Sequence, residues 1–378
     1  MSHTYLIEAL APLVFRSGKP FGVQSGADGG NFPLPSSLAG LARTLYADQA
    51  QRDFSSDLRD IAVLGPLLAR RSKNGEITPL LPRPADALYY KEGESAHIIR
   101  QAPVFSLTDC ACDLPSGLLP VQTRRQLAGK PVPGPQYWPL QRLIEWGKDG
   151  EIAFDALKEE GLNTLDIEER IHVALERKTG ASAEGQLFQT GGIDLSARRQ
   201  VEAWAGHDLV LIGRADVELR DDLVNLGGER RLSRLHAVAE NVWPAPPENL
   251  AEDIRSAGGL RLTFATPAIF NAGYLPGWLD ETLTGSPPGI SNFRLRLCAV
   301  AVERWLPVSG WDLAAKKPRA MRKAVAAGAV YWFECAGEIP EDFIPQLWLR
   351  PLSDQEQDRR DGFGLALPAP WTPIIGNG

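Results

Sequence analysis

The sequence predicts an α+β protein made of two strand-led halves, and its composition and patterning support this prediction. Short segments with alternating apolar and polar residues recur along the chain, while thirty prolines and thirty-six glycines interrupt long helices. The 378 residues and the apolar share of 44% are enough for two hydrophobic cores. The cluster of Pro244, Pro246 and Pro247 is typical of a linker, so we expect one domain at 1–245 and a second at 246–378.

The first half begins with a predicted strand and a predicted helix, joined by a glycine-rich loop. Alternation from Thr4 to Phe15 predicts a strand that Pro12 interrupts. The loop covers Ser17–Asn31. Ser36 or Ser37 is then expected to cap a helix, because apolar residues recur at helical spacing after this point.

The rest of the first half is expected to contain short strands and insertions. Prolines recur throughout Ile61–Pro139 and break every candidate helix there. Glu168–Glu176 and Gly185–Ile193 are predicted to pair as a protruding hairpin. Further strands are predicted within His207–Arg220 and Ser233–Val242.

The second half is predicted to contain strands and a basic segment. The strands are expected at Gly259–Ala265, Phe293–Val302 and Ala329–Cys335. The basic segment has Arg304, Lys316, Lys317, Arg319, Arg322 and Lys323 against a single acid, Asp312. Spacings of three and four residues among these cations are compatible with a solvated helix face, although Pro318 weakens that interpretation.

The overall charge limits the classes of function. A formal net charge of −7 argues against a free nucleic-acid-binding protein, because phosphate contacts require clustered Lys and Arg. A local basic segment in an acidic chain fits a subunit of a larger assembly. The four cysteines lack CxxC pairing and no signal peptide is recognisable, so a cytoplasmic location is expected. No apolar run reaches the roughly eighteen residues that a membrane span needs.

Several segments, spread in order over nearly the whole chain, carry a resemblance to a known family. They are Leu13–Phe21, Phe32–Thr44, Gly227–Arg231, Gly310–Leu313, Ala327–Tyr331 and Gly362–Gly364. Together they resemble the handle-binding RAMP-superfamily subunit, the third Cmr protein, of the type III-B CRISPR Cmr effector complex.

The resemblance implies a fold and a set of partners. The expected fold is two ferredoxin-like domains of the RNA-recognition type with hairpin and loop insertions. The expected role is that of a non-catalytic subunit that binds the 5′ handle of the crRNA. It would dock on the large polymerase-like subunit, contact a neighbouring backbone RAMP subunit, and meet the target RNA indirectly.

The candidate RNA-binding residues lie in the resembling segments, the predicted hairpin and the basic segment. A helix N-terminus offers unpaired N–H groups, and glycine-bearing turns let the backbone approach phosphate closely. The resemblance further implies that the hairpin lies along the guide and holds bases apart. The candidates are Arg16, Lys19, Ser36, Ser37, Arg43, Arg170, Arg177, Lys178, Gly227, Gly228, Arg230, Arg231, Lys316, Lys317, Arg319, Gly362, Phe363 and Gly364.

Each candidate also has a purely structural interpretation. Ser36 could cap a helix while Arg16 and Lys19 are solvated loop charges. The hairpin could be an ordinary exposed one, since Glu168, Glu169 and Glu176 dilute its cations. The glycine pairs could form tight turns beside surface arginines.

No motif in the sequence predicts catalysis, a metal or a cofactor. The five histidines lie in no metal-ligand or nucleophile motif, and there is no Walker loop or GxSxG elbow. The main rival hypothesis is a CRISPR-RNA-processing endoribonuclease of the same fold, with His172 or His236 as general acid or base. A second rival is a structural interaction protein without nucleic-acid contact.

Overall fold

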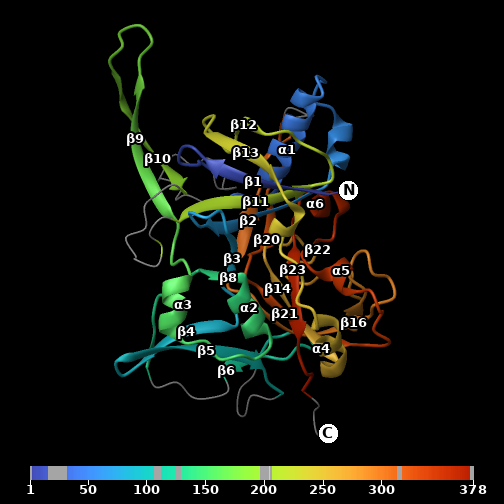
Figure 1. The fold of residues 1–378 in the computed structure, drawn as a ribbon. Helices are drawn as coiled ribbons and strands as arrows, with labels where there is room; N and C mark the ends of the chain where they lie inside the picture. The colour runs from blue at the N-terminus through green and yellow to red at the C-terminus, as the bar shows by residue number, and fades with distance from the viewer. Residues whose placement is uncertain are drawn as a thin grey trace.

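The computed structural model describes residues 2–15, 32–105, 112–123, 129–195, 204, 207–312 and 317–374. One large antiparallel sheet from each half forms its centre, and helices, a smaller inserted sheet and β-ribbons surround the two (Figure 1). This mixed architecture confirms the predicted α+β class.

The first sheet runs in the order β12-β13-β1-β11-β2-β3-β8. Its strands are β1 (His3–Ala9), β2 (Val63–Arg71), β3 (Ile77–Pro82), β8 (Tyr137–Pro139), β11 (Asp208–Ala215), β12 (Asp222–Asn225) and β13 (Leu232–Val238). Numbered by their order in the chain, β1, β2, β11 and β13 are the first to fourth of these strands. Across the sheet they lie in the order fourth, first, third, second, which is β13-β1-β11-β2. The strands predicted within 207–220 and 233–242 are confirmed, with shorter bounds.

Helix α1 (Pro35–Gln49) covers one face of the first sheet. Its Leu38 packs with Tyr5 and Ile7 of β1 in one apolar cluster. The expected serine cap is wrong: the helix begins at Pro35, with Leu34 as the capping residue and no side-chain cap. Proline is suited to the first helical position, because its φ is preset and its missing N–H needs no partner there.

The second sheet repeats the same strand arrangement in the second half of the chain. Its order is β15-β16-β21-β14-β23-β22. The strands are β14 (Gly259–Phe264), β15 (Thr284–Gly285), β16 (Leu295–Ala301), β21 (Val330–Cys335), β22 (Arg350–Pro351) and β23 (Leu365–Pro370). Numbered by chain order, β14, β16, β21 and β23 are again the first to fourth strands. From the β22 edge they lie in the order fourth, first, third, second, which is β23-β14-β21-β16. The three strands predicted in this half are confirmed.

Short helices surround the sheets. They are α2 (Leu140–Gly147), α3 (Phe154–Glu160), α4 (Leu250–Ala257), α5 (Ile344–Leu347), α6 (Glu356–Arg360) and the 3₁₀ turns at Ser56–Asp60 and Glu240–Val242. Helix α4 precedes β14, and α5 and α6 lie between β21 and β23 in the chain. None of the helices in the described ranges has the length and apolar character that a membrane span requires.

An insertion from the first half covers part of the second sheet. Its small sheet has the order β6-β5-β4-β7, with β4 (Ala87–Glu92), β5 (Ser95–Pro103), β6 (Val121–Thr123) and β7 (Lys130–Pro131). Leu119 N donates to Cys298 O of β16 over 2.7 Å, and Val121 packs on the cluster that contains Trp332 of β21. The predicted short strands of 61–139 are therefore confirmed, and they bind the two halves together.

The two halves share their main core. One cluster of buried apolar side chains contains Leu6 and Leu67 of the first sheet together with Leu262 and Phe333 of the second. The expected linker is also packed, since Trp348 Nε1 donates to Pro244 O over 2.9 Å. An apolar core that crosses the expected boundary makes the halves energetically dependent on each other.

Two β-ribbons leave this centre. The predicted hairpin is confirmed: β9 (Asp166–Leu175) pairs with β10 (Ser182–Asp194) and projects far from the body in Figure 1. The second ribbon consists of β17 (Trp305–Val308) paired with β20 (Arg322–Val325), and β18 (Trp311–Asp312) paired with β19 (Lys317–Pro318). The helical interpretation of the basic segment is therefore wrong, because its residues pair across a ribbon.

The predicted first strand is shorter than expected. It ends at Ala9, and beyond Pro12 only isolated bridges continue, from Leu13 to Ile193 and from Val14 to Gly228. Proline has no N–H to donate to a sheet, which explains the early end.

Candidate nucleic-acid interface

The ribbon of residues 305–312 and 317–325, here called the basic ribbon, carries most of the basic segment. A bulge divides it, because one residue separates Val308 from Gly310 on the outgoing strand while two separate Arg319 from Arg322 on the returning strand. Arg319 N donates to Gly310 O over 2.8 Å and continues the pairing past the bulge. Lys317 and Lys323 are exposed on the ribbon.

Buried carboxylates hold the arginines of the basic ribbon in place. Asp358 accepts two hydrogen bonds from Arg322, at 2.6 and 2.7 Å, in a bidentate arrangement. Arg319 Nη1 lies 3.2 Å from Asp361 Oδ2. Both carboxylates are almost fully buried, whereas about a third of each guanidinium side chain is exposed. The pairs therefore fix one edge of each guanidinium, while the arginine side chain as a whole stays partly exposed.

Asp361 also joins the two halves through Arg43 of α1. The two side chains are 2.6 Å apart, and only 4% of Arg43 and 1% of Asp361 are exposed. Arg43 further donates to Ile61 O over 2.8 Å. Arg43 was predicted to bind RNA, but its guanidinium is enclosed and engaged inside the protein. We therefore assign it a structural role.

The segment Gly362–Gly364 is packed inside the protein. The Phe363 ring is buried in a small cluster with Ile269 and Val308, against which Leu34 also packs. Gly362 has φ +91°, and a Cβ there would lie 2.7 Å from Val63 O. These residues were predicted to contact RNA, yet their burial leaves no surface for stacking or phosphate binding. They connect the basic ribbon to the start of α1.

Ser36 and Ser37 are the second and third residues of α1, at the end that this cluster supports. Ser37 N donates to Leu34 O over 2.9 Å, so one of the N–H groups predicted to face phosphate is already paired. The structure thus brings the α1 start, the 362–364 segment and the basic ribbon together. The sequence had presented them as separate segments.

The predicted turn at Gly227 and Gly228 lies against the end of the described N-terminal segment. Gly228 N donates to Val14 O over 2.8 Å. Gly227 has φ +82°, and a Cβ there would lie 2.6 Å from Val14 O, so glycine is required. Arg230 is exposed, whereas Arg231 pairs with Glu229 over 2.7 Å.

Three of the predicted residues, Arg16, Lys19 and Lys316, lie outside the described residues.

The β9–β10 hairpin presents an apolar face rather than a strongly cationic one. Ile171 is 70% exposed and Leu187 is 67% exposed, and Val173 is paired directly with Leu187. Arg170 is paired with Glu168, while Arg177 and Lys178 lie exposed at the tip. Exposed apolar side chains in a row indicate a surface that another molecule covers.

Neither large sheet presents a free central face. One face of the first sheet lies under α1, and the opposite residues belong to the shared core. The inserted sheet packs on β16 and β21 of the second sheet, α2 and α4 lie against β14 and β23, and β14 and most of β21 are buried. A nucleic acid could not stack on the sheet centres, as it does in RNA-recognition domains, so contact must involve ribbons, loops and edges.

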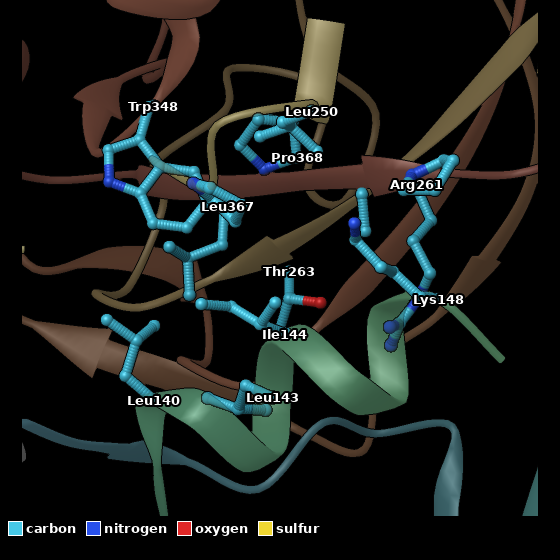
Figure 2. Close-up of a pocket in the computed structure, with 13 residues that line it drawn as sticks. Leu140, Leu143, Ile144, Lys148, Leu250, Arg261, Thr263, Trp348, Leu367 and Pro368 are labelled. Atoms are coloured by element: carbon cyan, nitrogen blue, oxygen red, sulfur yellow. The ribbon is translucent and has the colours of Figure 1, made fainter. Parts of the chain in front are cut away.

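A small pocket lies between α2, α4 and the strands β14 and β23 (Figure 2). Its cavity volume is about 20 Å³, which is space for about one water molecule. Arg261 lines it and pairs with the buried Asp86 over 2.8 Å, while Trp146 Nε1 donates to the same carboxylate over 2.9 Å. The pocket therefore lies at the junction between the inserted sheet and the second large sheet.

The two histidines of the rival hypothesis have different surroundings. His172 contacts Thr190 across the hairpin, with 2.9 Å between Nε2 and Oγ1. His236 lies 3.2 Å from Asp221 and 3.8 Å from Glu8. A backbone N–H from Ala237 and the neighbouring His236 lower the pKa of Asp221, which keeps it negative. Two carboxylates beside His236 would repel an approaching phosphate.

Among the described residues, no group of three or more His, Cys, Asp and Glu side chains is arranged to hold a metal ion. The sequence reasoning missed one feature of the site. Trp305 and Trp311 are 57% and 58% exposed on the basic ribbon. The sequence indicated these residues only as two tryptophans within the cationic segment, and their exposure could not be inferred from that.

Comparisons with known proteins identify the family. A chain of the cryo-EM structure of the type III-B Cmr-beta bound to cognate target RNA has a TM-score of 0.52 and 16% identity, over 96% of both chains. A chain of the cryo-EM structure of the type III-B Cmr-beta bound to cognate target RNA and AMPPnP, state 1, has a TM-score of 0.47 and 15% identity, over 87% of this chain and 86% of that one. No curated protein matches. The family model described as CRISPR-associated protein (Cas_Cmr3) matches residues 5–371, and the chain therefore belongs to the Cas_Cmr3 family.

Proposed function

We propose that this chain is a non-catalytic subunit of a type III-B Cmr effector complex and that it binds the 5′ handle of the guide RNA. Family membership over residues 5–371 supports the proposal, as does the fold shared with a chain of a Cmr-beta complex bound to cognate target RNA. The observation that carries the RNA-binding role is the basic ribbon. It concentrates cations on a chain whose formal net charge is −7.

The basic ribbon would contact the sugar-phosphate backbone. Lys317 and Lys323 are exposed cations, and about a third of the side chain of both Arg319 and Arg322 is exposed. Because Asp361 and Asp358 already orient those guanidinium groups, less side-chain freedom is lost when a phosphate binds. Such contacts bind any sequence and position the strand.

The two halves correspond, in our proposal, to ferredoxin-like domains at 1–245 and 246–378. The fourth-first-third-second strand order in both sheets supports this. The full ferredoxin-like pattern has one helix after the first strand and another before the last. Among the described residues, the first half has a helix at only the former of these two positions, α1, and the second half has helices at only the latter, α5 and α6. The β9–β10 hairpin and the inserted sheet are additions to the first domain.

The protein partners that we propose are the large polymerase-like subunit and a neighbouring backbone subunit. The apolar face of the β9–β10 hairpin, with Ile171, Val173 and Leu187, supports contact with a protein surface. A two-stranded hairpin gains little stability alone, so a partner that covers this face would also rigidify it. Target RNA would be met only through the assembled complex.

The test is guide retention by the assembled complex. The chain is co-expressed with the other subunits and a guide, and bound RNA is quantified after purification over a series of salt concentrations. Lys317→Glu with Lys323→Glu should lower guide retention and make the salt slope shallower by about 0.7 per lost phosphate contact. The matched control is Lys73→Glu with Lys158→Glu, two exposed lysines in the first half.

Unchanged retention and salt slope in the Lys317/Lys323 variant would contradict the proposed interface. Metal-independent cleavage of a repeat RNA by the purified wild-type chain, lost on substitution of His172 or His236, would replace the non-catalytic role by the endoribonuclease one.

A further inference from the structure

The two exposed tryptophans of the chain lie on the same ribbon. All ten tryptophans fall within the described residues, and all except Trp305 and Trp311 are buried or half-buried. A tryptophan removes a large apolar surface from water when it is buried, so two tryptophans that remain more than half exposed indicate a binding surface. Both belong to the outgoing strand of the basic ribbon.

The surroundings of these rings are cationic. Lys323 Nζ lies 5.3 Å from the centre of the Trp305 ring, in a cation–π arrangement. The described part of the basic ribbon contains four cations, Lys317, Arg319, Arg322 and Lys323, and one acid, Asp312. Asp361 and Asp358, from outside the ribbon, pair with two of these cations, the arginines. Exposed aromatic rings beside a row of cations are the combination that binds single-stranded nucleic acid, with bases stacked on the rings and phosphates along the cations.

We propose that Trp305 and Trp311 stack on separate unpaired bases of one RNA strand that runs along the basic ribbon. The inference rests on the proposed guide-binding function and names the chemistry of that site. Six residues of extended chain span about 20 Å, so a single base cannot contact both rings. Stacking accepts any base, and the ribbon would therefore hold a strand without reading its sequence.

A protein partner is the alternative occupant, because tryptophan, methionine and arginine are enriched at protein interfaces. Met321 is also exposed on this ribbon. The charge favours RNA: the centre of a protein interface is depleted in charged residues, and lysine in particular is rare there. Here the Lys323 ammonium lies within cation–π distance of the Trp305 ring.

The test compares three substitutions at both tryptophans in the complex assembled without a guide and then titrated with a fluorescent guide RNA. Phenylalanine keeps a smaller π face, leucine keeps apolar surface without a π face, and alanine removes both. We expect alanine to weaken binding of a fluorescent single-stranded RNA by roughly 5- to 150-fold per lost stack. Phenylalanine should retain much of the affinity, and leucine should resemble alanine.

Two controls make the result specific. Met321→Ala removes an exposed apolar side chain from the same ribbon, and Tyr274→Ala removes an exposed aromatic ring elsewhere in the second half. Both should leave RNA affinity within about twofold of wild type if stacking on Trp305 and Trp311 is the cause. Photocrosslinking with 5-iodouridine RNA should also yield adducts in the peptides that contain these tryptophans.

The outcomes separate the two proposals. A wild-type complex that does not bind the guide RNA would overturn the proposed function. A wild-type complex that binds it, with alanine variants of equal affinity, would overturn only the stacking. Leucine variants with wild-type affinity, or alanine variants that lose a protein subunit while their RNA affinity is unchanged, would assign the tryptophans to a protein partner.

Discussion

The ion pair between Arg43 and Asp361 offers a direct measure of how strongly the two halves are coupled. Asp361→Asn removes the negative charge and leaves a guanidinium that is 4% exposed without a counter-ion. Breaking a buried pair in this way costs about 3–5 kcal/mol. With an unfolding entropy of about 2.1 cal/mol/K per residue, a chain of this length loses about 4–6 °C in Tm for that cost.

The structure also predicts which partner matters more. When Arg43 is replaced by Met, Asp361 still has two hydrogen-bond partners, Arg319 at 3.2 Å and Gln357 at 2.9 Å. When Asp361 is neutralised, by contrast, Arg43 is left with carbonyl oxygens alone as acceptors. Asp361→Asn should therefore lower Tm more than Arg43→Met, and the double variant should lose less than both single losses added together. Thermal unfolding by circular dichroism measures all three. A shift below about 1 °C for Asp361→Asn, or strict additivity, would refute the reasoning.

Three further predictions follow from local chemistry. Hydrogen bonds from Arg142 lower the pKa of Glu160. The ion pair therefore stabilises the folded state at pH values above the pKa that this carboxylate has in the unfolded chain. The stabilisation is lost as pH falls through the lower pKa of the folded state. Glu160→Gln should cost about 0.2–1 kcal/mol at pH 7, and urea unfolding near pH 3 should give a smaller difference. Burial raises the pKa of the Cys335 thiol to about 11, so mass spectrometry should find iodoacetamide on the exposed Cys112 well before Cys335 at pH 8; equal rates would contradict this burial. Ile171→Lys on the hairpin should leave Tm within about 1 °C and reduce self-association in light scattering; a large loss of Tm would mean that the face is packed.

Alternation along the chain was sufficient to predict β1, β11, β13, β14, β16, β21 and the projecting hairpin, but it did not locate β2 or β23. The strands at 208–215, 232–238, 259–264, 295–301 and 330–335 follow a pattern that each segment carries by itself. The hairpin needed only two such runs and a turn between them. For the basic segment the sequence left a solvated helix face open as an alternative, because cations three and four residues apart also occur by chance on a ribbon. Only the pairing with Trp305–Val308 decides between the two.

The sites were less predictable than the strands. Arg43 and Phe363 looked like surface residues of conspicuous motifs, and both are buried. Burial depends on what lies across the fold, and the partner of Arg43 is 318 residues away in the chain. No local pattern encodes such a contact. The exposure of Trp305 and Trp311 is equally non-local, since tryptophans usually fill cores.

By itself, the sequence determined the α+β class, the position of the projecting hairpin and of six strands in the two large sheets and, through segments spread along the chain, the family. Tertiary structure alone decided which charged and aromatic side chains reach solvent and which join the two halves. The physical reason is that strand propensity is set by neighbours along the chain, whereas burial and ion pairing are set by residues brought together only when both sheets pack around their shared core.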